Sequence, residues 1–132
     1  MKPITKEWLR KADRDFSTMN RESRVDDNPN TDAITYHAQQ CAEKYLKGYL
    51  QEFDILFPKT HDLSVLLELA KKKQSEFKSL QDDCNFLTYF AVRFRYPGED
   101  PTLDDAEQAI TSCGRIRKLI RELLTQTDQM TL

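Results

Sequence analysis

Glycine and proline are scarce in this chain of 132 residues, which contains three glycines and five prolines. Because both residue types interrupt helices, their scarcity is typical of a protein built from long helices. The chain also lacks any run of about 18 apolar residues, the length that a membrane-spanning helix requires. Its first residues, MKPITKEWLRKAD, lack the apolar stretch of a secretory signal. We therefore expect a cytoplasmic protein.

The sequence motifs of common enzymes are missing as well. Neither a glycine-rich phosphate loop nor a G-x-S-x-G nucleophile motif occurs. The two histidines, His37 and His61, lie on different predicted helices and do not form a metal pair by spacing. The cysteines also lack metal-like spacing, and we expect buried free thiols at Cys41, Cys84 and Cys113. The sequence thus indicates no metal, no cofactor and no catalytic residue.

Charge of one sign does not dominate either. The 20 Lys and Arg residues nearly balance the 22 Asp and Glu residues, which gives a net charge of −2. This balance argues against a broad basic face for nucleic acid, although it is compatible with a local cationic patch. With 39% apolar and 32% charged residues, the composition is that of a globular domain.

Five segments show the period of an amphipathic helix, with apolar side chains three or four residues apart. They cover residues 5–21, 32–53, 61–72, 75–94 and 102–123. Because short connections place successive helices side by side, the pattern predicts an all-α, up-and-down antiparallel bundle of four to five helices. We assign residues 1–132 to a single domain, with its core in residues 5–124 and a frayed tail at residues 125–132.

Two helix starts carry capping residues. Thr60 is the predicted N-cap of the third helix, and Thr102 has capping-box spacing to Asp105 at the start of the fifth. If the helix directions alternate, the second and fourth helices end at the same end of the bundle. The loop at residues 59–61 and the loop at residues 93–101 are then expected to lie together.

Polar residues on the second helix follow a regular spacing. Gln39, Glu43 and Lys47 stand opposite its apolar stripe, and the order of Glu43 and Lys47 favours an ion pair. An alternative is that Glu43 and Asp83 form a pair of catalytic carboxylates. We interpret both carboxylates instead as parts of solvated helix faces.

The stretch RFRYPGEDPT, residues 93–102, ends the fourth helix with a concentration of cationic and aromatic side chains. Arginine presents a planar fork of donors that suits phosphate, and tyrosine presents a stacking face. Together with the loop at the same expected end, this predicts an anion or nucleotide site formed by Arg93, Arg95, Tyr96, His61 and Lys59. The alternative is that the arginines interact with the C-terminal dipole of the helix while Tyr96 packs over the turn.

A second edge of apolar residues on the fourth helix indicates an additional interface. Phe86 and Phe90 lie beside the main apolar stripe of that helix. Together with Tyr36 and His37 of the second helix, they form a predicted dimer or partner face. The simpler interpretation of His37 alone is a partly buried, hydrogen-bonded polar residue.

Four segments occur in a familiar order: EWLRKADRDF, HAQQCAEKYLKGYLQEF, KTHDLSVLLEL and RFRYPGED. They resemble the HEPN domain family of prokaryotes, in the branch often encoded beside a minimal nucleotidyltransferase, over about residues 5–124. The resemblance implies a helical bundle, a symmetric homodimer, and a role in toxin–antitoxin or defence systems. It also implies nucleotide binding and, in many members, metal-independent RNA cleavage by an Arg followed four to six residues later by His.

The chain departs from that cleavage motif, because no histidine follows Arg93 or Arg95. Arginine stabilises negative charge but is a poor general base. The sequence therefore favours a HEPN-type module that binds a nucleotide, an RNA or a nucleotidyltransferase partner. The alternatives are a ribonuclease toxin that uses His61 or an unrecognised acid–base pair, and a purely structural dimerisation protein.

Overall fold

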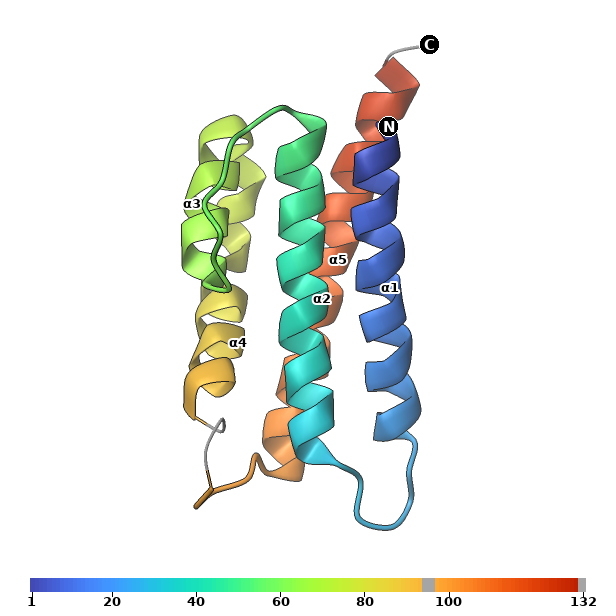
Figure 1. The fold of residues 1–132 in the computed structure, drawn as a ribbon, viewed down its shortest axis with the longest axis vertical. Coiled ribbons are helices and arrows are strands. Elements are labelled where there is room, and N and C mark those ends of the chain that lie inside the picture. Colours follow the sequence, from blue (N-terminus) through green and yellow to red (C-terminus); the bar gives the residue numbers. More distant parts are fainter. Residues whose placement is uncertain (94–96, 131–132) are drawn as a thin grey trace.

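The computed structural model describes residues 1–93 and 97–130, and the helices account for most of them (Figure 1). Within this part of the chain there are five α-helices, one 3-10 helix and no strand. The all-α bundle predicted from the sequence is thereby confirmed. The elements are α1 (Pro3–Ser23), α2 (Thr31–Glu52), α3 (Leu63–Lys73), η1 (Ser75–Leu80), α4 (Gln81–Arg93) and α5 (Leu103–Met130).

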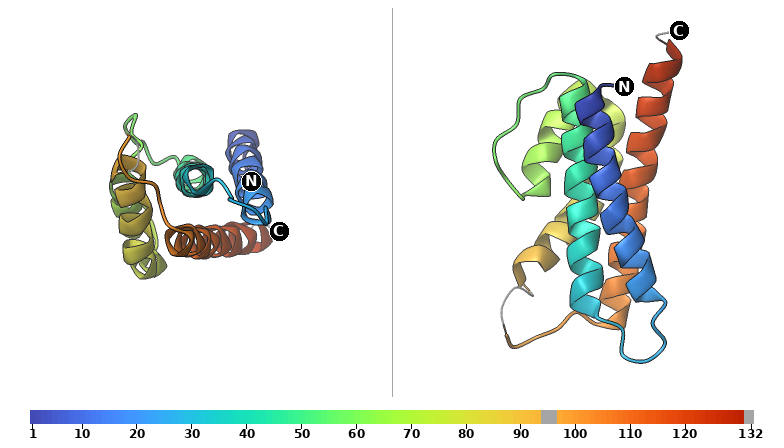
Figure 2. Two further views of the ribbon diagram at one scale, coloured as in Figure 1. Left: turned by 90° about the horizontal axis from the view of Figure 1, so that it is seen from below. Right: turned by 45° about the vertical axis from the view of Figure 1, so that its right-hand side comes forward.

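Helix α2 is the central element of the bundle. Seen along the bundle, it lies between α1 on one side and the α3–α4 pair on the other, with α5 alongside (Figure 2). Its most extensive packing is against α1 and α5. Consistent with this position, α2 is buried almost all round, and its core residues are Ile34, Ala38, Cys41, Ala42, Tyr45, Leu46, Tyr49 and Leu50.

Helix α3 runs in the same direction as α2, so the helix directions do not alternate throughout. At one end, the Gln39 amide of α2 donates a hydrogen bond to the His61 carbonyl oxygen just before α3, at 2.9 Å. At the other end, Lys73 Nζ of α3 lies 4.8 Å from the ring centroid of Phe53, which follows α2. Residues 53–62 run from the end of α2 back in the opposite direction before α3 begins (Figures 1 and 2).

This return corrects the expectation that the loop at residues 59–61 and the loop at residues 93–101 lie together. His61 lies beside the middle of α2, whereas α4 ends near the start of α2, where Asp100 approaches Asp32. The physical reason is the length of the connection. A short turn would have reversed the chain, but residues 53–62 are enough to run back along the helix and to start α3 in parallel.

The helix termini confirm one capping prediction and correct another. Thr102 and Asp105 form a reciprocal capping box: each backbone N–H donates to the other's side-chain oxygen, at 2.9 and 3.0 Å. At α3 the N-cap is Asp62, which accepts from Ser64 N at 2.9 Å, and Thr60 accepts from Asp62 N instead. Asp62 is the N-cap because it directly precedes the helix and because its negative charge interacts favourably with the positive N-terminal end of the helix dipole.

Helix α5 is longer than the sequence predicted. It continues to Met130, so the expected fraying from residue 125 does not apply to residues 125–130. No glycine or proline interrupts this segment, and backbone hydrogen bonding extends a helix one residue at a time. Residues 131–132 lie outside the described part of the chain.

The three cysteines are buried free thiols, as predicted from the sequence. Burial raises the pKa of Cys84 to about 12. The pKa of Cys41 is also raised, by its hydrogen bond with Cys113 and by burial. Core cysteines of this kind are unreactive and serve as small apolar side chains. Separately, no helix in the described residues has the length and apolar character to cross a membrane.

Gly48 allows α1 and α2 to approach closely. A Cβ atom at this position would lie 2.7 Å from Leu9 Cδ1 and 3.1 Å from Trp8 Cβ. By contrast, a Cβ atom at Gly114 in α5 would have no neighbour within 4 Å. The two helical glycines therefore have different reasons to be present, and only Gly48 is required by packing.

We expect Gly48→Ala to destabilise the fold and Gly114→Ala to stabilise it. Alanine favours a helix over glycine by about 1 kcal/mol at both positions, but overpacking at Gly48 costs about 1–3 kcal/mol. Urea unfolding of the two variants measures the difference directly. An equal gain of stability in both would contradict the close packing of α1 on α2.

Candidate binding groove between α2 and α4

A groove of about 690 Å³ lies along the first half of α2, bordered by the end of α4 and by the segment that precedes α3. The helices that form it stand side by side in Figure 1. Its lining combines aromatic, imidazole, amide and carboxylate groups. The lining residues are Asn30, Asp32, Ala33, Thr35, Tyr36, His37, Gln39, Gln40, His61, Asp62, Thr88, Phe90 and Ala91.

One wall of the groove is the segment that precedes α3, and a series of buried polar residues on α2 holds this segment in place. Lys47 Nζ donates to Glu43 Oε2 at 3.0 Å, and His61 Nδ1 lies 2.9 Å from Glu43 Oε1. Gln39 Nε2 donates to Glu43 at 3.3 Å and to the His61 carbonyl oxygen. Gln39, Glu43 and Lys47 are all buried. Because a buried carboxylate needs partners, these contacts attach residues 53–62 to α2.

The burial of Glu43 corrects the interpretation of its helix face as solvated. The apolar stripe of α2 is so wide that only this polar strip remains, and residues 53–62 cover it. Asp83 is also buried, but in a different network, where it accepts hydrogen bonds from Ser112 at 2.7 Å and Arg115 at 3.0 Å. Each carboxylate therefore has its own cationic partner.

His61 lines the groove and keeps an accessible ring. Its side chain is 80% exposed, although its Nδ1 contacts a carboxylate that is only 5% exposed. The contact with Glu43 orients the ring, and Nε2 is then available to a ligand. His61 therefore lies in the groove and not beside the end of α4, where the predicted anion site had placed it.

His37 is held in the same way from the other side of α2. Its Nδ1 lies 2.8 Å from Asp15 Oδ1 of α1, and Lys44 donates to Asp15 Oδ2 at 2.6 Å. The ring of Tyr36 contacts the His37 ring edge to face, with centroids 5.2 Å apart. Both histidines of the chain thus line one groove, and each is positioned by a carboxylate. Their spacing in the sequence does not indicate that they line the same groove.

Most of the predicted partner face coincides with this groove. Tyr36, which is 58% exposed, lies on it together with His37 and Phe90. Phe86 does not line the groove. It packs against Phe90, with ring centroids 4.5 Å apart, and so supports the wall from behind.

The residues predicted to form the anion site are not assembled in the groove. Arg93 lies at the end of α4, where it donates to Glu99 at 2.6 Å and contacts Tyr89. These two partners raise the pKa of Arg93. Lys59 is exposed and does not line the groove. Arg95 and Tyr96 lie outside the described residues.

Carboxylates mark the end of the groove near the start of α2. Burial and the nearby Asp100 raise the pKa of Asp32. Asp62 also contributes a carboxylate, at the start of α3. Among the described residues, the lining contains two aspartates and no lysine or arginine, and this part of the groove favours neutral, hydrogen-bonding groups of a ligand over its phosphates. In the part of the chain that the structure describes, no cluster of three or more His, Cys, Asp or Glu side chains could hold a metal.

The functional groups that the sequence analysis missed are Glu43, Gln39, Gln40 and Asp15. A signal was available for the first two, since a helix with such a wide apolar stripe is buried nearly all round. A regular polar series on such a helix is then expected to be buried and paired. For Asp15 the sequence contained no comparable signal, because α1 has an ordinary solvated face.

Comparison with known proteins identifies the family. The model of the HEPN domain matches residues 5–123, which is most of the chain. The chain belongs to the HEPN domain family. The crystal structure of ST0689, an archaeal HEPN homologue, superposes on this HEPN domain with a TM-score of 0.72. The match covers 93% of this chain and 98% of the homologue at 23% identity, which supports the same fold. A search of curated proteins found no match.

We expect Glu43→Gln to reduce the free energy of unfolding by roughly 3 kcal/mol, because Lys47 would be left buried without its anionic partner. Glu68→Gln is the matched control, since Glu68 is 63% exposed and pairs with Lys71 on the surface. Its effect should stay within about 0.5 kcal/mol. Urea unfolding compares the two, and equal losses would contradict the role of Glu43 in fixing residues 53–62.

Proposed function

We propose that this HEPN domain is a binding module that takes a nucleotide in the groove between α2 and α4. The volume of about 690 Å³ is in the range of small-molecule sites. The observation that carries the proposal is the exposed ring of Tyr36, which lies among amide and imidazole groups in one groove. An aromatic face stacks on a base, and amides recognise its hydrogen-bonding edge.

The charge of the groove supports one orientation of the nucleotide. Asp32 and Asp62 repel phosphates but accept hydrogen bonds from the amino groups of a base. Phe90 and Ala91 of α4 line the groove, and Arg93 follows about one helical turn after Phe90. We therefore place the base in the groove and the phosphates toward the end of α4, where Arg93 would exchange its contact with Glu99 for the ligand.

We further propose a cellular setting for this module. Membership of the HEPN domain family supports a role as one component of a toxin–antitoxin or defence pair with a minimal nucleotidyltransferase as partner. It also supports a cytoplasmic homodimer. The exposed ring of Tyr36 provides an aromatic surface for such a partner when the groove is not occupied by a nucleotide.

Calorimetric titration with ATP, GTP and the corresponding nucleosides tests the nucleotide proposal. Tyr36→Ala should weaken binding about tenfold, because it removes one stacking contact. Leu56→Ala is the control, since Leu56 is 92% exposed and lies outside the groove lining. The proposal is contradicted if millimolar nucleotide produces no heat of binding and also leaves the melting temperature unchanged. A stable dimer without any nucleotide response would favour the purely structural role.

A second candidate function is metal-independent RNA cleavage. It is favoured by the two carboxylate-held histidines, His37 and His61, along one groove. Cleavage needs one group that removes the proton of the 2′-hydroxyl and another that protonates the leaving oxygen, and imidazole serves both purposes. Asp15 and Glu43 would orient the two rings.

A fluorescent RNA substrate tests the second candidate. If the histidines are the acid and the base, His37→Gln and His61→Gln should each lower the cleavage rate by about 100-fold. Lys59→Gln, at an exposed position outside the groove, should leave the rate unchanged. The candidate fails if the purified protein does not cleave RNA, or if both histidine variants cleave as fast as the wild type.

A further inference from the structure

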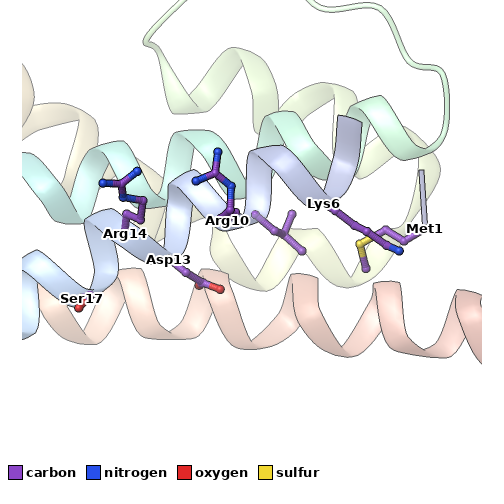
Figure 3. Close-up of a pocket in the computed structure, with 7 residues that line it drawn as sticks. Met1, Lys6, Arg10, Asp13, Arg14 and Ser17 are labelled. Carbon is purple, nitrogen blue, oxygen red and sulfur yellow. The ribbon is translucent and has the colours of Figure 1, made fainter. Parts of the chain in front are cut away.

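A second hollow, of about 520 Å³, lies on the surface of α1 that borders α5, and α2 separates it from the α2–α4 groove. Three cationic side chains surround it: Lys6, Arg10 and Arg14. Figure 3 shows the arginines extending from the same side of α1, while Asp13 points toward α5. The surface exposed in this hollow is more apolar than polar, and Leu9 is among its lining residues.

The three cations are not used by the fold. Among the described residues, Lys6, Arg10 and Arg14 take part in no ion pair and no side-chain hydrogen bond. They are spaced four residues apart, so they follow one face of α1 at intervals of about 6 Å. Three unpaired positive charges in a row produce a local positive potential, although the chain carries a net charge of −2.

The one carboxylate in the hollow does not offset this charge, because it is already paired. Asp13 accepts from Arg117 Nε at 3.0 Å and from Arg121 Nη1 at 3.3 Å, and it also accepts from the Tyr45 hydroxyl. Two arginines of α5 thus neutralise one aspartate of α1. Arg121 is 48% exposed and extends the positive surface across to α5.

The chemistry of this surface distinguishes between two kinds of anionic partner. Binding of a single-stranded nucleic acid usually combines cations with exposed aromatic rings for its bases. No aromatic residue of the described part of the chain lines the hollow, and the nearby ring of Phe16 is covered by the Arg117 guanidinium at 4.4 Å. An apolar base with cations along its edge instead matches a protein helix that has one apolar and one acidic side.

We propose that the hollow on α1 is a docking surface for an acidic amphipathic helix of a protein partner. The apolar side of that helix lies over Leu9 and the aliphatic parts of the cationic side chains. Its carboxylates, repeated at every fourth residue, pair with Lys6, Arg10 and Arg14. The proposal is independent of what occupies the α2–α4 groove, because α2 lies between the two surfaces (Figure 1).

A synthetic amphipathic peptide tests this proposal by fluorescence anisotropy. The probe carries Glu at every fourth position beside a leucine stripe, and the matched peptide carries Gln at those positions. We expect micromolar binding of the Glu peptide, weakened at least about tenfold by Arg10→Glu with Arg14→Glu, because attraction becomes repulsion at two positions. Added salt should weaken binding of the Glu peptide as well.

The control protein carries Lys72→Glu with Lys78→Glu, which changes the net charge by the same amount as Arg10→Glu with Arg14→Glu. Both lysines are exposed, lie on α3 and η1, and form no ion pair among the described residues. This control should bind the Glu peptide like the wild type. Arg10→Gln with Arg14→Gln is a milder variant that removes the two positive charges without adding negative ones. Circular dichroism of each protein checks that it is folded.

Three results would overturn the proposal: equal binding of the Glu and Gln peptides, an equal loss of binding in the Lys72 and Lys78 control, or no binding of the Glu peptide at all. An unstructured oligonucleotide that binds this surface more tightly than the Glu peptide would also overturn it, in favour of nucleic acid. Nucleotide titration of the Arg10 and Arg14 variant reports separately on the α2–α4 groove.

Discussion

The carboxylate of Glu43 lies beneath the segment 53–62 and contacts both Lys47 and His61. An unpaired charge in such a buried position would be costly, so the contacts are formed together or not at all. They determine where residues 53–62 lie on α2, and that path determines the level at which α3 starts. The groove wall, the exposed ring of His61 and the parallel course of α3 all depend on this buried group.

The polar residues of the bundle are distributed between two surfaces with different chemistry. On the α4 side of α2, carboxylates, amides and imidazoles surround an aromatic groove, and the described part of the chain contributes no lysine or arginine to its lining. On the outer side of α1, Lys6, Arg10 and Arg14 surround an apolar hollow whose only carboxylate is already paired. A net charge near neutrality therefore conceals an uneven distribution of charge between the two surfaces.

Individual residues show how far the sequence could predict the site. Tyr36, His37 and Phe90 were expected on one face, and all three line one groove because α2 and α4 pack side by side. His61 was assigned to a different site, since its position depends on a connection whose path has no local signal. Gln39 and Glu43 were predicted to be solvent-exposed. The i, i+4 spacing of polar residues on a helix is the same whether that face is exposed or buried, so the spacing alone could not reveal their burial.

The sequence by itself determined the helical class, the approximate positions of α1, α2, α3 and α5, and the capping box of Thr102 and Asp105, whereas the fourth helix predicted from residue 75 is η1 followed by α4. These features depend on neighbours within one or two turns, so local patterns contain them. Only the tertiary structure decided the direction of α3, the burial of Glu43 and the presence of both histidines in the lining of one groove. Those depend on how residues 53–62 pack on α2, and contacts between segments distant in sequence cannot be read from local periodicity.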